Sequence, residues 1–170
     1  FQKGWRPLHV TKAEGCYFWD KAGKRYLDLS SQLMCSNLGH QNPAVVEAIC
    51  KQARELAFIS PAFTCDVRAE ISEKLLEVMP KGLEKFFYTT SGTEAIEHAV
   101  RMARLHNGRP KVLAAYRSYH GSTTTSIHLT GDPRRWPSDT GAAGVVHFFG
   151  PFLYRSAFGS TVPEEECERA

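Results

Sequence analysis

Apolar and polar positions recur with helical spacing in three parts of the chain and form short β-prone runs in five others. The helical segments are residues 43–56, 66–78 and 91–106. The β-prone runs are residues 16–20, 24–28, 85–89, 111–116 and 145–149. This pattern therefore predicts both helices and strands, and their order along the chain differs between the two halves.

The first half begins with a predicted β-hairpin. Its two strand-like runs are joined by residues 20–23, which contain the turn-forming pair Ala22 and Gly23. Residues 29–41 are rich in Ser, Asn and Gly and are expected to form a loop. Asn42 followed by Pro43 is a typical helix start, and Asp66 is a candidate cap for the second helix.

The second half alternates strand, helix and strand, which is typical of an α/β fold with a mainly parallel sheet. We place a domain boundary near residue 60. Residues 1–60 form a small amino-terminal segment, and residues 61–170 begin a larger domain. The long segment 131–144, with Pro133 and Pro137, is expected to be a loop.

A further helix is predicted to start close to the end of the chain. Thr161 and Glu164 have the spacing of a capping box, with Thr161 as the N-cap. The sequence ends at Ala170, before this helix develops an apolar face. We therefore expect the chain to be a piece of a longer protein.

Composition excludes several classes of partner. Of the 170 residues, 42% are apolar and 23% are charged, which is ordinary for a soluble globular protein. The net charge is only +3, without a basic stripe, so we expect no nucleic-acid partner. No window is apolar enough for a membrane span. The five cysteines form no C-x-x-C pair and the histidines show no metal-ligand spacing, so we expect no metal site.

The strongest candidate for chemistry is the start of the third helix. Ser91 and Glu94 form a capping box, and the first amides of a helix lack partners inside the helix. Gly92 permits close approach of a ligand, and Thr93 adds a hydroxyl donor. With the positive end of the helix dipole, these groups can bind a phosphate dianion. A capping box that only starts a helix explains the same residues. Neither the P-loop pattern nor the G-x-G-x-x-G pattern is present.

The rest of that helix is expected to pack on a sheet. Its apolar stripe comprises Ala95, Ile96, Ala99, Val100 and Ala103. Glu97 and Arg101 are spaced for an i,i+4 ion pair on the surface, and Asn107-Gly108 is suited to end the helix.

A second group of candidate residues follows the run 111–116. In open α/β sheets, ligands bind beyond the carboxyl ends of strands, so residues 119–121 can face the same crevice as Thr93. The ring of Tyr119 can stack on a flat heterocycle, and His120 is a candidate general base. A core tyrosine with a bonded hydroxyl is the alternative for Tyr119.

These two motifs together resemble the class III aminotransferases, which have the pyridoxal-phosphate (PLP) fold type I. The first motif consists of Thr90, Ser91, Gly92, Thr93, Glu94, Ala95, Glu97, Ala99, Arg101, Ala103 and Arg104. The second consists of Tyr119, His120 and Gly121, and the opening segment adds Tyr26, Leu27, Asp28, Gly39, His40 and Pro43. The resemblance covers about residues 15–155. It implies a partial three-layer, mainly parallel sheet preceded by a hairpin-helix segment.

The resemblance also implies a cofactor and roles for particular residues. PLP would bind with its phosphate at Ser91, Gly92 and Thr93, with its ring stacked on Tyr119 and with His120 beside it. Met34 lies where related enzymes place an aromatic residue of the substrate pocket. Arg155 lies in a family-like stretch, and the resemblance gives it no role.

The activity implied is transfer of an amino group from an omega-amino acid or similar amine to a 2-oxo acid such as pyruvate, by a cytoplasmic homodimer. The lysine that forms the Schiff base, an aspartate at the ring nitrogen and a threonine of the partner subunit lie further along the chain in this family. No catalytic residue is therefore expected among these 170 residues, and the chain by itself is expected to be inactive.

Several alternatives stay open. The parent could be another class III member, acting on 4-aminobutyrate, ornithine or glutamate semialdehyde. The chain could be a non-catalytic module that binds phosphate or PLP. It could also be an unrelated phosphate or nucleotide binder.

Overall fold

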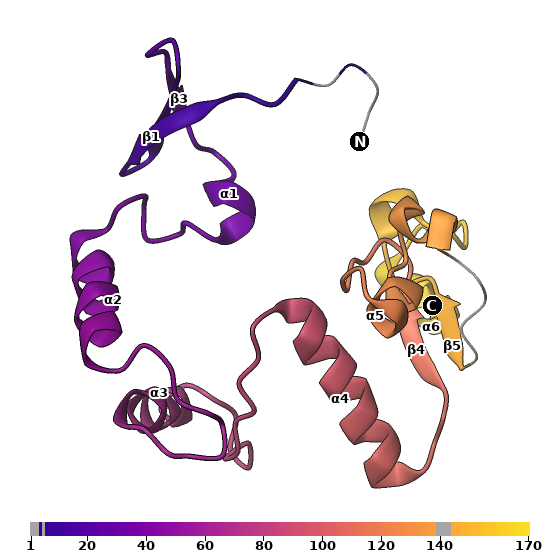
Figure 1. Cartoon of the computed structure of the whole chain (residues 1–170). Coiled ribbons are helices and arrows are strands. Elements are labelled where there is room, and N and C mark those ends of the chain that lie inside the picture. The colour runs from indigo at the N-terminus through magenta and orange to yellow at the C-terminus, as the bar shows by residue number, and fades with distance from the viewer. Residues whose placement is uncertain (1–3, 5, 139–143) are drawn as a thin grey trace. The chain divides into compact units, whose positions relative to one another are not determined.

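The computed structural model describes residue 4 and residues 6–138 and 144–170. The chain forms two compact units, Phe1–Pro80 and Lys81–Ala170, and each is described by itself (Figure 1). The division falls after Pro80, whereas the domain boundary predicted from the sequence lies near residue 60.

A small antiparallel sheet opens the first unit. Its strands are β1 (Val10–Glu14), β2 (Tyr17–Asp20) and β3 (Arg25–Leu27), in the order β1-β2-β3. The predicted hairpin is confirmed as β2–β3, while β1 was not predicted. One oxygen of Asp20 accepts hydrogen bonds from the amides of Ala22 and Lys24, both at 2.9 Å, which closes the turn.

The segment predicted as a loop contains one unusual turn, α1 (Ser31–Met34). Its four residues all have positive φ angles, from 47° at Ser31 to 64° at Met34. Left-handed backbone costs free energy for residues with a Cβ atom, so consecutive residues in this state are rare. Residues 31–34 therefore form a left-handed turn within the loop.

Asp28 ties this loop to the sheet. Its carboxylate lies 2.8 Å from Nε2 of His40 and accepts a hydrogen bond from Gln32. His40 and Gly15 exchange two backbone hydrogen bonds of 2.8 and 3.0 Å. Burial acts to raise the pKa of Asp28, but the hydrogen bonds from Gln32, His40 and Ser30 outweigh it and lower the pKa to about 2.

We expect this carboxylate to contribute to the acid stability of the first unit. Because its folded pKa of about 2 lies below the ordinary 3.8, its stabilisation is complete above about pH 4 and is lost as the pH falls toward 2. Asp28→Asn should make the thermal midpoint less dependent on pH in this window, whereas Glu55→Gln, at an exposed site, should leave the dependence unchanged. An unchanged pH profile for Asp28→Asn would contradict the assignment.

Two helices complete the first unit. They are α2 (Pro43–Glu55) and α3 (Asp66–Leu76). As predicted, the side chain of Asn42 caps α2, accepting from the amide of Ala44 at 3.1 Å. The N-cap of α3 is Cys65 rather than the predicted Asp66. Asp66 is instead the first helical residue, where its charge still suits the positive end of the helix.

The second unit is an α/β arrangement around two parallel strands. β4 (Val112–Ala115) pairs with β5 (Val145–Phe148) in parallel, with Val112 opposite Val145. The long helix α4 (Gly92–Asn107) precedes β4, and the short α5 (Thr124–Leu129) contacts α4, β4 and β5. Figure 1 shows α5 beside the two strands. The buried side chains of this unit gather at α5 and β4, and they include Ala114, Ser126, Ile127, Leu129 and Thr130.

Two predictions for the second unit were wrong in detail. Residues 85–89 form no strand, since no backbone segment among the described residues pairs with them. An extended segment becomes a β-strand only when a neighbour accepts its hydrogen bonds. The predicted loop 131–144 contains the 3₁₀ helix η1 (Pro133–Ser138), and residues 139–143 lie outside the described part.

The predicted capping box at the last helix is also wrong. Helix α6 (Pro163–Arg169) has Val162, not Thr161, as its N-cap, without a capping side chain. A nearby carboxylate, that of the buried Glu166, instead accepts from the amide of Phe152 at 2.8 Å and from Oγ of Ser156 at 2.5 Å. These bonds hold the two ends of the 3₁₀ turn η2 (Leu153–Arg155).

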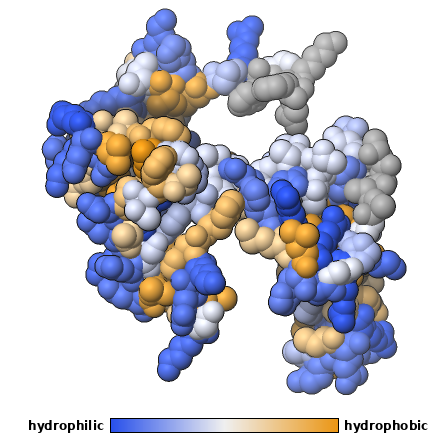
Figure 2. Space-filling view, turned by 60° about the horizontal axis from the view of Figure 1, so that its bottom comes forward, coloured by the Kyte–Doolittle hydropathy of each residue, from blue (hydrophilic) through white to orange (hydrophobic). Residues whose placement is uncertain are grey.

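Both units expose large apolar side chains, visible as orange areas in Figure 2. Examples are Phe58, Phe63, Phe87 and Leu105. Apolar surface of this extent is typical of regions that contact other protein, a membrane or a ligand. Among the helices of the described residues, none is long and apolar enough to cross a bilayer.

Candidate functional site

One groove of the second unit contains all the residues predicted to bind the cofactor. It has a volume of about 530 Å³ and lies between the start of α4 and the segment that follows β4. Its lining comprises Ser91, Gly92, Thr93, Ala95, Ile96, Tyr119, His120 and Gly121. The helix start and the tyrosine therefore face the same space, as the sequence predicts.

The start of α4 is built by a capping box that reaches one residue further than predicted. Oγ of Ser91 accepts from the amide of Glu94 at 3.2 Å. The carboxylate of Glu94 accepts from the amide and hydroxyl of Thr90, at 2.8 and 2.7 Å, instead of from the amide of Ser91. The hydrogen bond from the Thr90 side chain is the main cause that lowers the pKa of Glu94.

The first amides of α4 remain available as donors. Among the described residues, the amides of Gly92 and Thr93 and the hydroxyl of Thr93 have no hydrogen-bond acceptor. Space is open beside Gly92, where an added Cβ would meet nothing within 4 Å. Three donors at the positive end of a 16-residue helix fit a phosphate group.

The aromatic side of the groove is held by backbone contacts at the end of β4. Arg117 has a positive φ of 65°, and its amide donates to the carbonyl of Gly131 at 3.1 Å. The amide of Gly131 donates in turn to Ser118 at 2.9 Å. Tyr119 is about half exposed, and its hydroxyl lies 2.9 Å from that of Ser122. The ring is thus fixed at its hydroxyl while much of its area stays accessible.

Gly121 brings the two sides of the groove into direct contact. A Cβ atom at this position would lie 2.2 Å from Oγ1 of Thr93 and 2.7 Å from Oγ of Ser126. Its φ of 129° is also a backbone state that L residues rarely adopt. Only glycine therefore allows residues 119–121 to lie against the start of α4.

His120 lines the groove next to Tyr119. Its amide donates to Oγ1 of the buried Thr130 at 3.0 Å, which fixes the backbone at this point. Its ring forms no hydrogen bond with the described residues, so it is free to contact a ligand.

Glu97 has a role that the sequence did not suggest. The expected pair with Arg101 is not formed. One carboxylate oxygen of Glu97 instead accepts from the hydroxyl of Thr123 at 2.5 Å and from the amides of Thr125 and Ser126 at 2.9 and 3.1 Å. Burial opposes ionisation, but these hydrogen bonds lower the pKa of Glu97. Glu97 therefore caps α5 from a neighbouring helix. The signal for it was the Ser/Thr-rich segment 122–126, whose first helical amides need an acceptor.

Met34, the predicted substrate-pocket residue, belongs to the first unit. It lies in the left-handed turn α1 and is exposed. Together with Leu38 and Val45 it lines a shallow hollow of about 260 Å³. The role of Met34 in a substrate pocket therefore stays a prediction.

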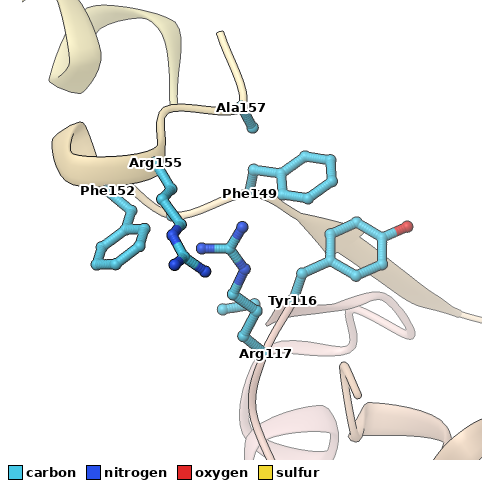
Figure 3. Close-up of a pocket in the computed structure, with 8 residues that line it drawn as sticks. Tyr116, Arg117, Phe149, Phe152, Arg155 and Ala157 are labelled. Atoms are coloured by element: carbon cyan, nitrogen blue, oxygen red, sulfur yellow. The ribbon is translucent and has the colours of Figure 1, made fainter. Parts of the chain in front are cut away.

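A second pocket of the second unit contains Arg155, to which the sequence gave no role. The pocket measures about 200 Å³ and lies where the parallel strands β4 and β5 end. Figure 3 shows the guanidinium groups of Arg117 and Arg155 pointing toward one another in it. The Arg117 guanidinium lies 5.1 Å from the centre of the Phe152 ring. Among the described residues, no group of three or more His, Cys, Asp or Glu side chains could hold a metal ion.

Comparison with known proteins finds relatives that match most of this chain. The family Aminotransferase class-III matches residues 2–156. The chain is 33% identical over 165 residues to putrescine–pyruvate aminotransferase of Pseudomonas aeruginosa, covering 92% of this chain and 36% of that protein. It is 36% identical over 131 residues to a [LysW]-aminoadipate semialdehyde/glutamate semialdehyde transaminase of Sulfurisphaera tokodaii, covering 77% of this chain and 34% of that protein.

Solved structures extend the agreement to the fold. The taurine:2-oxoglutarate aminotransferase of Bifidobacterium kashiwanohense, in complex with PLP and glutamate, is 38% identical with a TM-score of 0.84. That match covers 97% of this chain and 38% of the other. The omega transaminase of Pseudomonas jessenii, in complex with PMP, has a TM-score of 0.90 at 30% identity, covering 96% and 38%. This chain spans about a third of the length of these relatives.

These structural neighbours show that the chain forms part of the PLP fold type I. The chain belongs to the class III aminotransferase family.

Proposed function

We propose that this chain supplies the phosphate-binding and ring-stacking side of the PLP site of a longer aminotransferase. The observation that carries the proposal is the groove in which three free donors of α4 and the ring of Tyr119 face the same space. The amides of Gly92 and Thr93 and the hydroxyl of Thr93 bind the phosphate. Ser91 fixes the helix start, Tyr119 stacks on the ring and His120 contacts the cofactor beside it.

When bound, PLP supplies a carbonyl carbon that accepts an amino group and a ring that withdraws electrons from it. The residues of this chain orient the cofactor. Their donors form hydrogen bonds to the phosphate at a helix start, where the helix dipole favours negative charge. The ring of Tyr119 then covers one face of the cofactor and excludes water from it.

Thr93→Ala provides the test of this site. In the whole protein that contains this chain, we expect it to weaken PLP binding by about 1.5–3 kcal/mol, since it removes a hydrogen bond to a charged group. Thr93→Ser keeps the hydroxyl and serves as the control, with affinity close to that of the unchanged protein. The measurement is the dissociation constant of PLP from the apo-protein. If it stays constant in Thr93→Ala, Thr93 acts only at the helix start.

For the substrates, we propose an omega-amino acid or similar amine as donor and a 2-oxo acid such as pyruvate as acceptor. The similarity to putrescine–pyruvate and taurine:2-oxoglutarate aminotransferases supports this choice. A second candidate is a semialdehyde or acetylornithine transaminase, supported by relatives of 36–37% identity. Initial rates of the whole protein with taurine, putrescine and acetylornithine, each with pyruvate and with 2-oxoglutarate, decide between them. Preference for acetylornithine would overturn the first proposal.

We further propose that the whole protein is a homodimer. The large apolar side chains exposed on this chain support an extensive interface with other protein. Light scattering coupled to gel filtration should give twice the monomer mass, and a monomer would contradict the proposal.

A further inference from the structure

Tyr119 has a charged neighbour that the function proposed above does not use. The guanidinium carbon of Arg134 lies 3.8 Å from the centre of the Tyr119 ring. A cation at this distance over an aromatic face is attracted by the electrons of the ring. It also occupies that face, so a second flat group cannot stack there.

Arg134 is held in this position by Asp132. Nε of Arg134 donates to both carboxylate oxygens, at 3.1 and 2.9 Å, and Nη2 donates to one of them. The backbone amide of Arg134 donates to the same carboxylate at 2.9 Å. An arginine bound in this way has lost most of its rotational freedom, because its planar fork is fixed by several bonds to one carboxylate.

The segment that carries Arg134 is attached to the segment that carries Tyr119. Gly131, next to Asp132, exchanges two backbone hydrogen bonds with Arg117 and Ser118. A Cβ at Gly131 would lie 2.2 Å from the carbonyl oxygen of Ala115, so the two backbones are in direct contact. The distance between the guanidinium and the ring is therefore set by the fold and not by two independent loops.

The two faces of the Tyr119 ring thus have different surroundings. Tyr119 lines the groove with Thr93 and Gly121, whereas Arg134 is not part of the groove lining. The guanidinium lies over one face of the ring, which leaves the opposite face for a flat ligand in the groove. The hydroxyl of Tyr119, bonded to Ser122, fixes the far end of the ring.

We propose that Arg134 is a positioning residue, which covers the back of Tyr119 and sets the plane of the ring against which the cofactor stacks. The inference rests on the proposed function, because it requires a flat ligand in the groove. Arg134 acts through Tyr119 and does not itself contact the cofactor. Asp132 acts one step further away, by orienting Arg134.

The test is a double-mutant cycle in the whole protein. We expect Arg134→Ala to weaken PLP binding to the apo-protein about three- to tenfold, because the ring of Tyr119 then has to be ordered when the cofactor binds. The strength of a partly exposed cation–π contact limits the size of this loss. Arg134→Lys keeps the charge but not the planar fork, and should give a smaller loss. In a Tyr119→Leu background, Arg134→Ala should cause no further loss, because the ring on which it acts is absent.

A spectroscopic measurement separates positioning from general stability. The visible circular dichroism of bound PLP depends on a fixed asymmetric environment, so it should fall in Arg134→Ala and recover partly in Arg134→Lys. Arg109→Ala, an exposed arginine beyond the other end of α4, is the matched control and should change neither quantity.

The outcomes distinguish this inference from the proposed function. If Arg134→Ala lowers PLP affinity equally with and without the Tyr119 ring, the positioning role of Arg134 is overturned, since Arg134 would then act on the ligand directly. An unchanged affinity and dichroism in Arg134→Ala would also overturn it, even where Thr93→Ala and Tyr119→Leu weaken PLP binding. If Thr93→Ala and Tyr119→Leu are both without effect, the proposed function itself fails.

Discussion

Replacing Gly121 by alanine is expected to reduce PLP binding by the whole protein by at least about 100-fold, and to destabilise it by about 3 kcal/mol or more. The added Cβ would lie 2.2 Å from Oγ1 of Thr93 and 2.7 Å from Oγ of Ser126, distances that no real contact allows. The backbone at Gly121 has a φ of 129°, so alanine is strained there even without the overlap. The groove would have to widen, which separates the ring of Tyr119 from the donors of α4.

A second glycine of the same unit is the control for this change. Gly150 has no positive φ, and an added Cβ there would meet nothing within 4 Å. Gly150→Ala should therefore change stability by less than about 0.5 kcal/mol and leave PLP binding unchanged. Affinity for PLP and the midpoint of urea denaturation are the two measurements. Normal PLP affinity in Gly121→Ala would show that residues 119–121 do not form one side of the cofactor site.

Glu97→Ala is the second substitution with a large expected effect, a loss of about 3 kcal/mol in the free energy of unfolding. It removes the acceptor for the hydroxyl of Thr123 and the amides of Thr125 and Ser126. Hydrogen bonds to charged groups are worth about 1.5–3 kcal/mol each, and three that share one carboxylate do not add fully. Because Ser126 is fully buried beside Gly121, movement of α5 should also weaken PLP binding.

The pH dependence of the free energy of unfolding tests whether the charge of Glu97 causes this stabilisation. Its pKa in the folded state is below the ordinary 4.5, so its contribution is present above pH 4.5 and is lost as the pH falls below that value. Glu97→Gln keeps the size of the side chain and one carbonyl acceptor. About half of the contribution of Glu97 to the free energy of unfolding should therefore remain, and this remainder should not depend on pH in the acid range. Arg101→Ala is the control, because the sequence predicted a surface ion pair between Arg101 and Glu97. This substitution should change the free energy of unfolding very little. A large loss in Arg101→Ala with none in Glu97→Gln would contradict the assignment.

The sequence predicted most elements with local signals. The hairpin β2–β3 follows from its turn residues, α2 from Asn42 and Pro43, and α4 from its capping box and apolar stripe. Gly108, in a left-handed conformation with a φ of 67°, ends α4 as predicted. In each case, the deciding interactions lie within a few residues along the chain.

Predictions that depend on distant partners were less successful. Residues 85–89 have the composition of a strand but lack a partner among the described residues. Thr161 and Glu164 have the spacing of a capping box, yet α6 starts after Val162, and its Glu166 binds the segment around Arg155. The spacing of Glu97 and Arg101 indicated a surface pair, whereas Glu97 binds α5. Local spacing shows which contacts are possible, and the fold selects among them.

The sequence by itself determined the family motif, the helix start at Ser91 and the presence of an aromatic residue after β4, because these depend on short-range backbone chemistry. Only the tertiary structure decided that Gly121 touches Thr93, that Glu97 caps α5 and that Arg134 covers one face of Tyr119. These contacts join residues 15 to 29 positions apart. Whether such residues meet depends on how β4, α4 and α5 pack, which no local pattern specifies.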